Sequence, residues 1–223
     1  MSRNTELYVA TTHYHPEHTL GGSAFPPTAK FVRPKMQQQD MDELGKDIQN
    51  TFASRSPLHQ ELLKDVPYPR ADILFDREHR IDLGGVHVRL MARGPLHTRG
   101  DTLIVVEEDR VLFSGDVVMN GVFLAASPTS SIAAWIATLD ELDALGPAVV
   151  VPSHGKVGDA ALIAKDRDYL KAVQARVREL KAQGKSADDT AQVVATDIQA
   201  RFSDWTAPMR IGAAARAAYA EAR

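Results

Sequence analysis

The chain has 223 residues, of which 44% are hydrophobic, 26 are basic and 29 are acidic, so its formal net charge is −3. This length and apolar content suffice for a sizeable core, and we expect a single domain over residues 1–223. The balanced charge gives no electrostatic sign of nucleic-acid binding, and the absence of cysteine excludes disulfides, thiolate metal ligands and a cysteine nucleophile.

The sequence carries no apolar run long enough to span a bilayer, so we expect no membrane partner. The polar start from Ser2 to Glu6 has no signal-peptide core. The location in the cell stays open: cytoplasmic if this N-terminus is complete, and periplasmic or secreted if a signal segment has been lost from it.

The densest chemical signal lies close to the N-terminus. Residues 7–11 are apolar and β-branched and predict a buried strand, while Leu20-Gly21-Gly22 predicts a turn. The short loop between them holds three histidines and a carboxylate: His13, His15, Glu17 and His18. Borderline divalent metals prefer such ligands, and packing explains so dense a group poorly, because each buried histidine needs its own polar partner. The cluster therefore predicts a metal site at the end of a strand.

A short helical turn is expected at 23–27 and a short strand at 29–32. Residues 37–54 are polar with apolar side chains at roughly helical spacing, which predicts an amphipathic helix on the surface. Residues 56–70 contain three prolines and predict a loop that lies near the site as a lid.

The middle of the chain is rich in strand signals. Strands are expected at 72–75, 80–83, 86–91, 102–106, 111–113 and 148–151. The first three look like an antiparallel meander, because a Gly-Gly turn and period-two alternation join them. Residues 130–145 carry an apolar stripe at helical spacing that Gly146-Pro147 stops.

The C-terminal part, residues 159–223, is expected to be helical. One helix should run to about residue 183, another over 187–202, and a short last one after Pro208. The alanine-rich end, residues 213–222, is expected to fray.

Three further candidate ligands follow predicted strands. His97 comes in the loop after 86–91, Asp116 directly follows a strand through Ser-Gly, and His154 follows the apolar strand 148–151. An α/β sheet gathers its strand ends at one edge, so these side chains can meet the N-terminal cluster. Three histidines around one zinc leave a fourth position for water, and a carboxylate, a histidine and a bridging aspartate can hold a second ion.

In order and loop context, these motifs resemble those of the metallo-β-lactamase superfamily over residues 7–156. The resemblance implies an α/β fold, an αββα sandwich of two mixed β-sheets flanked by helices, with a zinc pair at one sheet edge. Position by position, it implies that His13, His15 and His97 hold the first ion and that Glu17, His18 and His154 hold the second. Asp116 would bridge the two.

The resemblance also implies a metal-dependent hydrolase. Its metal-bound hydroxide would attack an ester, thioester, lactone, lactam or similar bond of a small-molecule substrate, and Asp116 and Glu17 would orient that hydroxide and help move its proton. Two zinc ions are expected, and iron or manganese suit the same ligands. We expect the pocket walls to come from residues 23–36, 56–70 and 119–123.

The sequence departs from the family pattern in three ways. Glu17 stands where the family usually has an aspartate, so its carboxylate must fold back or shift the second ion. The lack of cysteine excludes the β-lactamase subclass that uses a cysteine ligand. Most members have strands before the histidine cluster, so the first sheet is expected to be incomplete or to be completed by another chain, which favours a homo-oligomer.

Other readings of the same residues stay open. The superfamily also contains single-iron oxygenases of sulfur compounds, and a metal-binding accessory protein without turnover is a third alternative. Asp101 is expected to form a turn or to contact a ligand. The remaining candidates are surface or strand histidines (His59, His79 and His87) and side chains that either line the substrate mouth or pack (Tyr14, Phe25, Met119 and Phe123).

Overall fold

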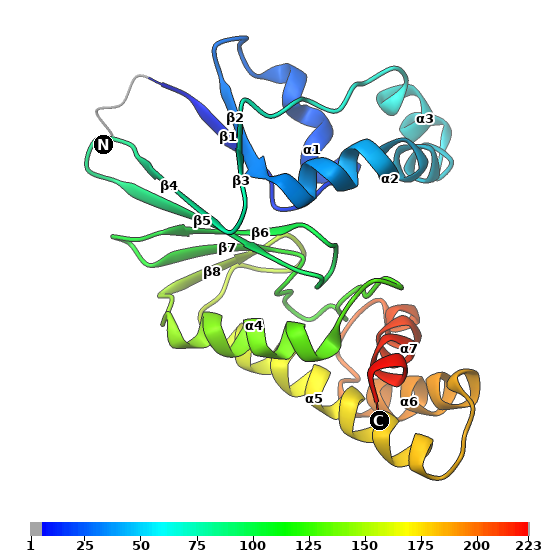
Figure 1. Cartoon of the computed structure of the whole chain (residues 1–223). Coiled ribbons are helices and arrows are strands. Elements are labelled where there is room, and N and C mark those ends of the chain that lie inside the picture. The colour runs from blue at the N-terminus through cyan, green and yellow to red at the C-terminus, as the bar shows by residue number, and fades with distance from the viewer. Residues whose placement is uncertain (1–5, 223) are drawn as a thin grey trace.

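A computed structural model of the protein describes residues 6–222, so the polar segment from Ser2 to Thr5 lies outside the described residues. Two β-sheets stack in the middle of the molecule and helices cover them on both outer sides (Figure 1). The αββα sandwich expected from the sequence is therefore confirmed.

The first sheet contains β1 (Tyr8–Ala10), β2 (Lys30–Pro34) and β3 (Ile73–Phe75), in that order. All of its strand pairs are parallel. The expectation that this sheet would be mixed was therefore wrong. The placement of 72–75 in an antiparallel meander was wrong, because β3 pairs with β2 through Val32 and Ile73. Phe75 belongs to the core between the sheets, and the chain then crosses to the second sheet, where β4 begins at Glu78.

The second sheet contains five strands in sequence order: β4 (Glu78–Asp82), β5 (His87–Arg93), β6 (Asp101–Val106), β7 (Val111–Gly115) and β8 (Val149–Pro152). Its pairs are antiparallel except for the parallel pair β7–β8, so this sheet is mixed. Successive side chains of β5 point to opposite faces of the sheet. Leu90 packs in the core between the two sheets, and its neighbour Met91 packs in the core between the second sheet and the helices. Both faces of the sheet are therefore buried.

The helices divide between the two sheets (Figure 1). With the first sheet lie α1 (Pro16–Thr19), the 3₁₀ helix η1 (Leu20–Ala24), α2 (Lys35–Ala53) and α3 (Pro57–Leu63). With the second lie α4 (Ile132–Ala144), α5 (Ala161–Ala182), α6 (Ala187–Arg201), the 3₁₀ helix η2 (Pro208–Arg210) and α7 (Ile211–Glu221). Within residues 6–222, no helix combines the length and the apolar character needed to cross a membrane.

Two local predictions near the first sheet need correction. The helical turn expected at 23–27 lies earlier, at η1. The segment 56–70 is not only a loop, because it contains α3. Pro57 fits the first position of that helix, and the Ser56 hydroxyl accepts a hydrogen bond from the His59 backbone N–H at 3.2 Å.

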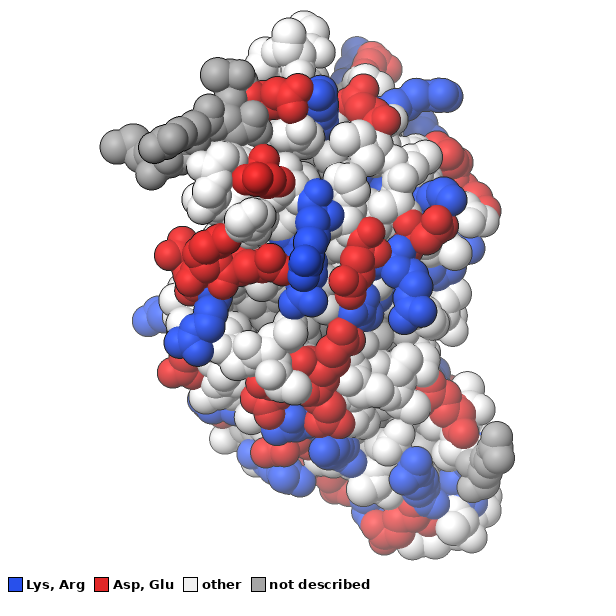
Figure 2. All heavy atoms as spheres, turned by 60° about the vertical axis from the view of Figure 1, so that its left-hand side comes forward, with Lys and Arg blue, Asp and Glu red and all other residues white. Residues whose placement is uncertain are grey.

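Charges of both signs are interspersed on the surface, as the small net charge suggests. Figure 2 shows basic and acidic side chains mixed over the face that lies on the left of Figure 1, with no large area of one sign. Ion pairs join neighbouring strands of the second sheet; Glu107, for example, lies 3.2 Å from Arg80 and 3.4 Å from Arg89.

The alanine-rich C-terminal end does not fray in the structure. Ala214, Ala215, Ala217 and Ala218 of α7 are buried in the same core as α5 and α6. Small side chains let α7 approach those helices closely, so the alanines are packing residues. The sequence prediction failed because alanine's low hydrophobicity hides a buried face.

This packing predicts that a buried alanine of α7 will not tolerate a charge. Ala214→Glu should lower the free energy of unfolding by about 3 kcal/mol, because it places an unpaired carboxylate and extra volume in a filled core. Ala220→Glu, on the exposed face of the same helix, should change it by no more than about 0.5 kcal/mol. Urea unfolding of both variants measures the difference, and equal stabilities would contradict the burial of α7.

Candidate metal centre

The N-terminal cluster is folded into one tight turn. The chain leaves β1, and His15 caps α1, which starts at Pro16, so Glu17 and His18 stand on the short helix itself. The His18 backbone N–H donates to the His15 carbonyl at 3.0 Å. The Thr19 hydroxyl donates to the His13 carbonyl at 2.9 Å. These bonds close the turn and present several potential ligands within a few residues.

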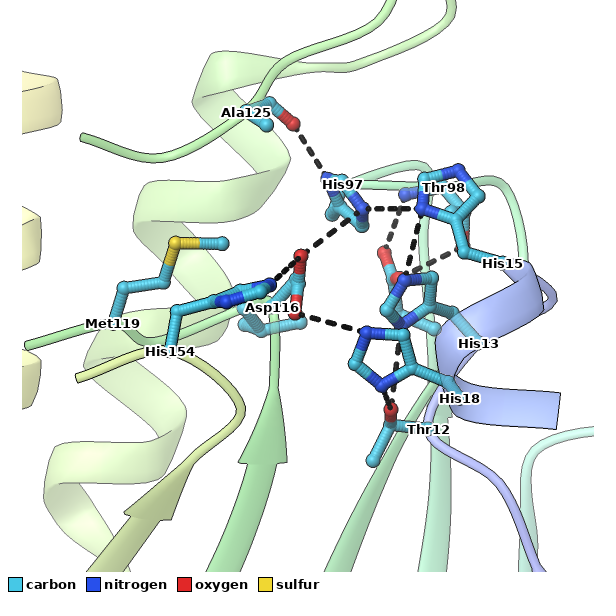
Figure 3. Close-up of polar contacts among 12 residues, drawn as sticks. Thr12, His13, His15, His18, His97, Thr98, Asp116, Met119, Ala125 and His154 are labelled. Atoms are coloured by element: carbon cyan, nitrogen blue, oxygen red, sulfur yellow. Dashed lines mark hydrogen bonds and ion pairs between the residues drawn. The ribbon is translucent and has the colours of Figure 1, made fainter. Parts of the chain in front are cut away.

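Thr12 orients two of the imidazoles. Its hydroxyl oxygen lies 3.2 Å from His13 Nδ1 and 3.4 Å from His18 Nδ1 (Figure 3). Contacts at Nδ1 leave the Nε2 atom of each ring directed away from Thr12. The two Nε2 atoms are therefore available to an ion in the centre of the site.

His97 comes from the loop between β5 and β6. Its Nδ1 lies 2.6 Å from the Ala125 carbonyl, which can only accept, so Nδ1 carries the proton and Nε2 presents a lone pair. Asp101 holds this loop in place by accepting hydrogen bonds from the Thr98 backbone N–H at 2.9 Å and the Thr98 hydroxyl at 2.7 Å. Asp101 is thus turn-forming, one of the two roles expected for it.

Asp116 and His154 stand at the ends of β7 and β8, which are parallel neighbours. Gly115 allows Asp116 its position, since its φ is +57° and a Cβ there would lie 2.6 Å from Thr12 Cβ. Gly155 does the same for His154, with a φ of +92° and a hypothetical Cβ only 2.2 Å from the Asn120 carbonyl oxygen. Both strand ends can therefore approach the N-terminal turn.

The first three histidines converge through one nitrogen each. His15 Nδ1 lies 3.1 Å from His13 Nε2 and 3.3 Å from His97 Nε2 (Figure 3). Tetrahedral nitrogen ligands bound to zinc at about 2.0–2.1 Å lie about 3.3–3.4 Å from one another. The spacing of this group therefore fits a single ion.

Asp116 faces both halves of the site. One carboxylate oxygen lies 3.6 Å from His18 Nε2, and the other lies 3.4 Å from His97 Nε2 and 3.5 Å from His154 Nε2. Two further groups have their ligand atoms within 4.8 Å of one another: His13, His18 and Asp116, and Glu17, His18 and His154. Glu17 and His154 are the most exposed of these residues, each with 37% of its side chain exposed, and the Glu17 carboxylate lies 3.8 Å from His18 Nε2.

Two buried atoms in this cluster lack a hydrogen-bond partner, namely His18 Nε2 and Asp116 Oδ1. A buried polar atom without a partner costs free energy, and the pair face each other at 3.6 Å. A cation would satisfy both. The donor set of imidazoles and carboxylates suits zinc, iron and manganese, so the residues present fit a divalent metal.

Burial sets the protonation of the histidines. It lowers the pKa of His13 well below its usual value, and it lowers that of His15 to about 3, helped by the charge of His97. It also lowers the pKa of His18 and His97. These rings are neutral at neutral pH, which is the form that binds metals.

The pKa values of the two carboxylates shift in opposite directions. Burial acts to raise the pKa of Asp116, but His154, His97 and His18 outweigh it and lower the value to about 2. Burial raises the pKa of Glu17, and the charge of Asp116 adds to the rise. The hydrogen bond with Asp116 raises the pKa of His154.

Two cavities adjoin the cluster, with volumes of about 380 and 370 Å³. His15 and His97 line the first, together with Tyr14 and the segment from Ala125 to Thr129. Glu17 and His154 line the second, together with side chains of α2, of α3 and of the turn between them: Phe52, Arg55, His59, Leu62 and Leu63. Each cavity therefore adjoins different members of the cluster.

The cavity walls differ in part from the expectation. The 56–70 segment contributes three wall residues through α3, including His59, which was expected to be a plain surface residue. Residues 23–36 line neither of these two cavities. Met119 and Phe123 are fully buried and pack, whereas Tyr14 does line the mouth. His87 pairs with Glu108, and His79 stacks on Phe75, as expected of strand residues outside the site.

Comparison with known proteins identifies the family. The family model described as the metallo-beta-lactamase superfamily matches residues 4–154. The chain belongs to this superfamily. Proteins of this fold generally bind divalent metals, and every residue of the cluster falls within the matched range. Among curated proteins, none matches the chain.

Solved structures similar to this member of the superfamily share its fold at low sequence identity. A metallo-beta-lactamase from Pontibacter korlensis is 19% identical with a TM-score of 0.59, over 74% of this chain and 69% of that one. A beta-lactamase domain protein from Burkholderia ambifaria is 22% identical with a TM-score of 0.65, over 96% and 68%. The sec-alkylsulfatase Pisa1 from Pseudomonas sp. is 15% identical with a TM-score of 0.68. That match covers 96% of this chain but only 41% of the sulfatase, so the chain spans less than half of that protein's length.

Sequence reasoning missed the residues that hold the candidate ligands in place. The Ala125 carbonyl orients His97. Every residue has a backbone carbonyl, so the amino-acid sequence does not mark this role. Thr12, in contrast, directly precedes His13 in the sequence, and this adjacency is a signal that its hydroxyl could contact the imidazole.

The geometry predicts that His15 is required for metal binding and that His59 is not. His15→Ala should weaken zinc binding by about 100-fold or more, because loss of a partner of a ligand already costs about 10- to 100-fold. His59→Ala, which changes a neighbouring cavity wall, should bind zinc as the unchanged protein does. Isothermal titration of zinc into the metal-free proteins measures both, and equal affinities would exclude the convergence of His13, His15 and His97 on an ion.

Proposed function

We propose that this protein is a metal-dependent hydrolase that cleaves an ester, thioester, lactone, lactam or similar bond in a small molecule. Two zinc ions are our first choice of cofactor, with iron or manganese as alternatives. The observation that carries the proposal is the meeting of seven imidazole and carboxylate side chains beside two cavities, with the nitrogen spacing of a metal site. When bound there, divalent ions would supply an activated water at neutral pH and a Lewis acid for the substrate oxygen.

The chain's own residues would hold the reacting groups in place. Asp116 stays ionised because of its low pKa, so it is a weak base, and its role is to orient a water by accepting a hydrogen bond. Glu17, whose pKa is raised by burial and whose side chain reaches the second cavity, is better suited to accept a proton. His154 is half-buried at the edge of the same cavity and can contact the leaving group.

The two cavities support a small-molecule substrate. The first cavity offers hydroxyls of Ser127 and Thr129, and the second offers an apolar wall of Phe52, Leu62 and Leu63. Volumes of about 370–380 Å³ suit the parts of a small molecule. The likeness to a sec-alkylsulfatase is a reason to include a sulfate ester among the substrates tested.

The proposal predicts turnover that depends on His97. Zinc-loaded protein should hydrolyse at least one member of a panel of ester, thioester, lactone, lactam, phosphodiester and sulfate-ester substrates. His97→Ala should abolish this turnover, because it removes a ligand whose orientation the Ala125 carbonyl fixes. His79→Ala, on β4 and stacked on Phe75, is the matched control and should keep full activity.

Metal analysis of the purified chain distinguishes the alternatives. One iron per chain with oxygen uptake would favour a sulfur oxygenase instead of a hydrolase. Metal binding without turnover on any panel member would favour an accessory protein.

A further inference from the structure

A further cavity lies away from the metal centre, between the second sheet and the end of α4. Its volume is about 180 Å³. β6 begins and β7 ends beside the candidate ligands, whereas this cavity lies at the opposite ends of the same two strands, near the hairpin that joins them (Figure 1). Four apolar and three charged residues line this distal cavity, and none of them is a candidate metal ligand. Any ligand it holds is therefore separate from the metal centre.

The apolar walls of the distal cavity come from the sheet and from the end of α4. Val105 of β6 and Leu112 of β7 belong to the core between the second sheet and the helices. Leu145 caps the end of α4, and the buried Pro147 follows it. An apolar cavity of about 150 Å³ can hold a benzene molecule. The distal cavity therefore has room for a hydrocarbon group of that size.

The charged lining of the distal cavity has more positive than negative groups, because Arg89 and Arg110 face only one acidic residue, Glu107. The Glu107 carboxylate lies 3.4 Å from Arg89, and it is shared with Arg80, which lies outside the cavity lining, at 3.2 Å. Arg110 has no carboxylate within 4.0 Å among residues 6–222. An anionic group would therefore be attracted to this lining.

Arg89 shows most clearly that a hydrogen-bond acceptor is missing. Only 20% of its side chain is exposed, and its buried Nε has no hydrogen-bond partner. Arg93, at the next position on the same face of β5, donates to Glu141 and to the Ala92 carbonyl. A guanidinium has five N–H donors, and buried donors without partners cost free energy. The difference between the two arginines points to a ligand that accepts hydrogen bonds at Arg89.

Backbone bonds hold the two sides of the distal cavity at a fixed spacing. Arg110 adopts a left-handed conformation with a φ of +51°, and its N–H donates to the Glu107 carbonyl at 3.3 Å. Its own carbonyl accepts a hydrogen bond from the Ala148 N–H at 2.8 Å. This last bond ties the β6–β7 hairpin to the segment that follows α4. A cavity held in this way is preformed, so a ligand pays little for ordering it.

We propose that the distal cavity binds a small apolar carboxylate. The carboxylate group contacts the guanidinium groups of Arg89 and Arg110 through charge-assisted hydrogen bonds. The hydrocarbon part packs against Val105, Leu112 and Leu145, where it is removed from water. Benzoate and 3-methylbutanoate represent the aromatic and the aliphatic form of this ligand. The site requires neither the metal nor the proposed hydrolysis.

The test is an NMR titration of benzoate into the full-length protein with isotope-labelled methyl groups. The methyl signals of Val105, Leu112 and Leu145 should shift with a Kd of about 1 mM or below. Benzamide has nearly the same shape without the charge and should bind about 10-fold more weakly or worse. A parallel titration with 3-methylbutanoate shows which hydrocarbon part fits better, and binding of either carboxylate at these residues supports the inference.

Titrations of the metal-free and the zinc-loaded protein separate this site from the metal centre. The Kd should be the same in both, because the distal cavity shares no residue with the cluster. A carboxylate bound only to zinc would instead shift the signals of Leu62 and Leu63 and leave those of the distal cavity unchanged. That result would overturn the inference.

Variants test the role of Arg89. Arg89→Gln should weaken benzoate binding about 10- to 100-fold, because it removes hydrogen bonds to a charged group. Arg80→Gln is the matched control: it removes a partner of the same Glu107 without changing the cavity lining, so benzoate affinity should stay unchanged. Thermal unfolding is measured for both variants. If Arg89→Gln unfolds, Arg110→Gln decides, with an expected weakening of about 3- to 10-fold because water screens this exposed side chain.

Three results would overturn the inference. They are equal benzoate affinity in folded Arg89→Gln and Arg80→Gln, equal affinity for benzoate and benzamide, and no shift of the three methyl signals with either carboxylate up to about 20 mM. None of them bears on the proposed function, since the hydrolase assays depend on the metal centre alone.

Discussion

The candidate metal centre depends on a polar tie between the two sheets, built around Gln37 at the start of α2. The Gln37 side-chain amide accepts a hydrogen bond from the Thr11 hydroxyl at 2.9 Å and donates to the Thr11 carbonyl at 2.9 Å. It also lies within donating distance of the Gly100 carbonyl, at 3.4 Å, and the Thr102 hydroxyl, at 3.2 Å. The Thr102 backbone N–H completes the tie by donating to the Thr12 carbonyl at 2.6 Å.

This tie sets the separation of ligands that are far apart in the sequence. Thr11 and Thr12 lead directly into His13, and Gly100 follows His97 by three residues. The close approach of the two segments requires glycine at position 100, because a Cβ there would lie 2.4 Å from the Gln37 backbone nitrogen. A fully buried amide with several partners holds both chain segments rigidly, because each broken bond would leave a polar group unpaired at a cost of about 1–3 kcal/mol.

The sequence predicted much of the cluster because its signals are local. Histidines and carboxylates followed segments with clear strand character, and the edge of an α/β sheet brings such ends together. What could not be predicted depends on contacts between distant segments. The pairing of β3 with β2 instead of β4 is one example, and the burial of Gln37 on a helix expected at the surface is another.

The docking of the C-terminal segment shows the same limit. The segment around Pro208 reads only as the start of a short helix, and no motif surrounds it. Its position comes from the bonds of Thr206 with Gly121 and Phe123, which join residues more than 80 positions apart. A pattern search over neighbouring residues cannot detect such a contact.

The dispersal of the candidate ligands over four strand ends would couple cation binding to the folding equilibrium. An unfolded chain keeps only the group from His13 to His18 together, and it separates His97, Asp116 and His154 from that group. The complete set of candidate ligands is therefore assembled only in the native state, so an ion held by it would stabilise that state by mass action. Any binding of the ion by the local group of the unfolded chain would reduce this effect. The melting temperature of this protein should thus follow the free concentration of the ion in its surroundings.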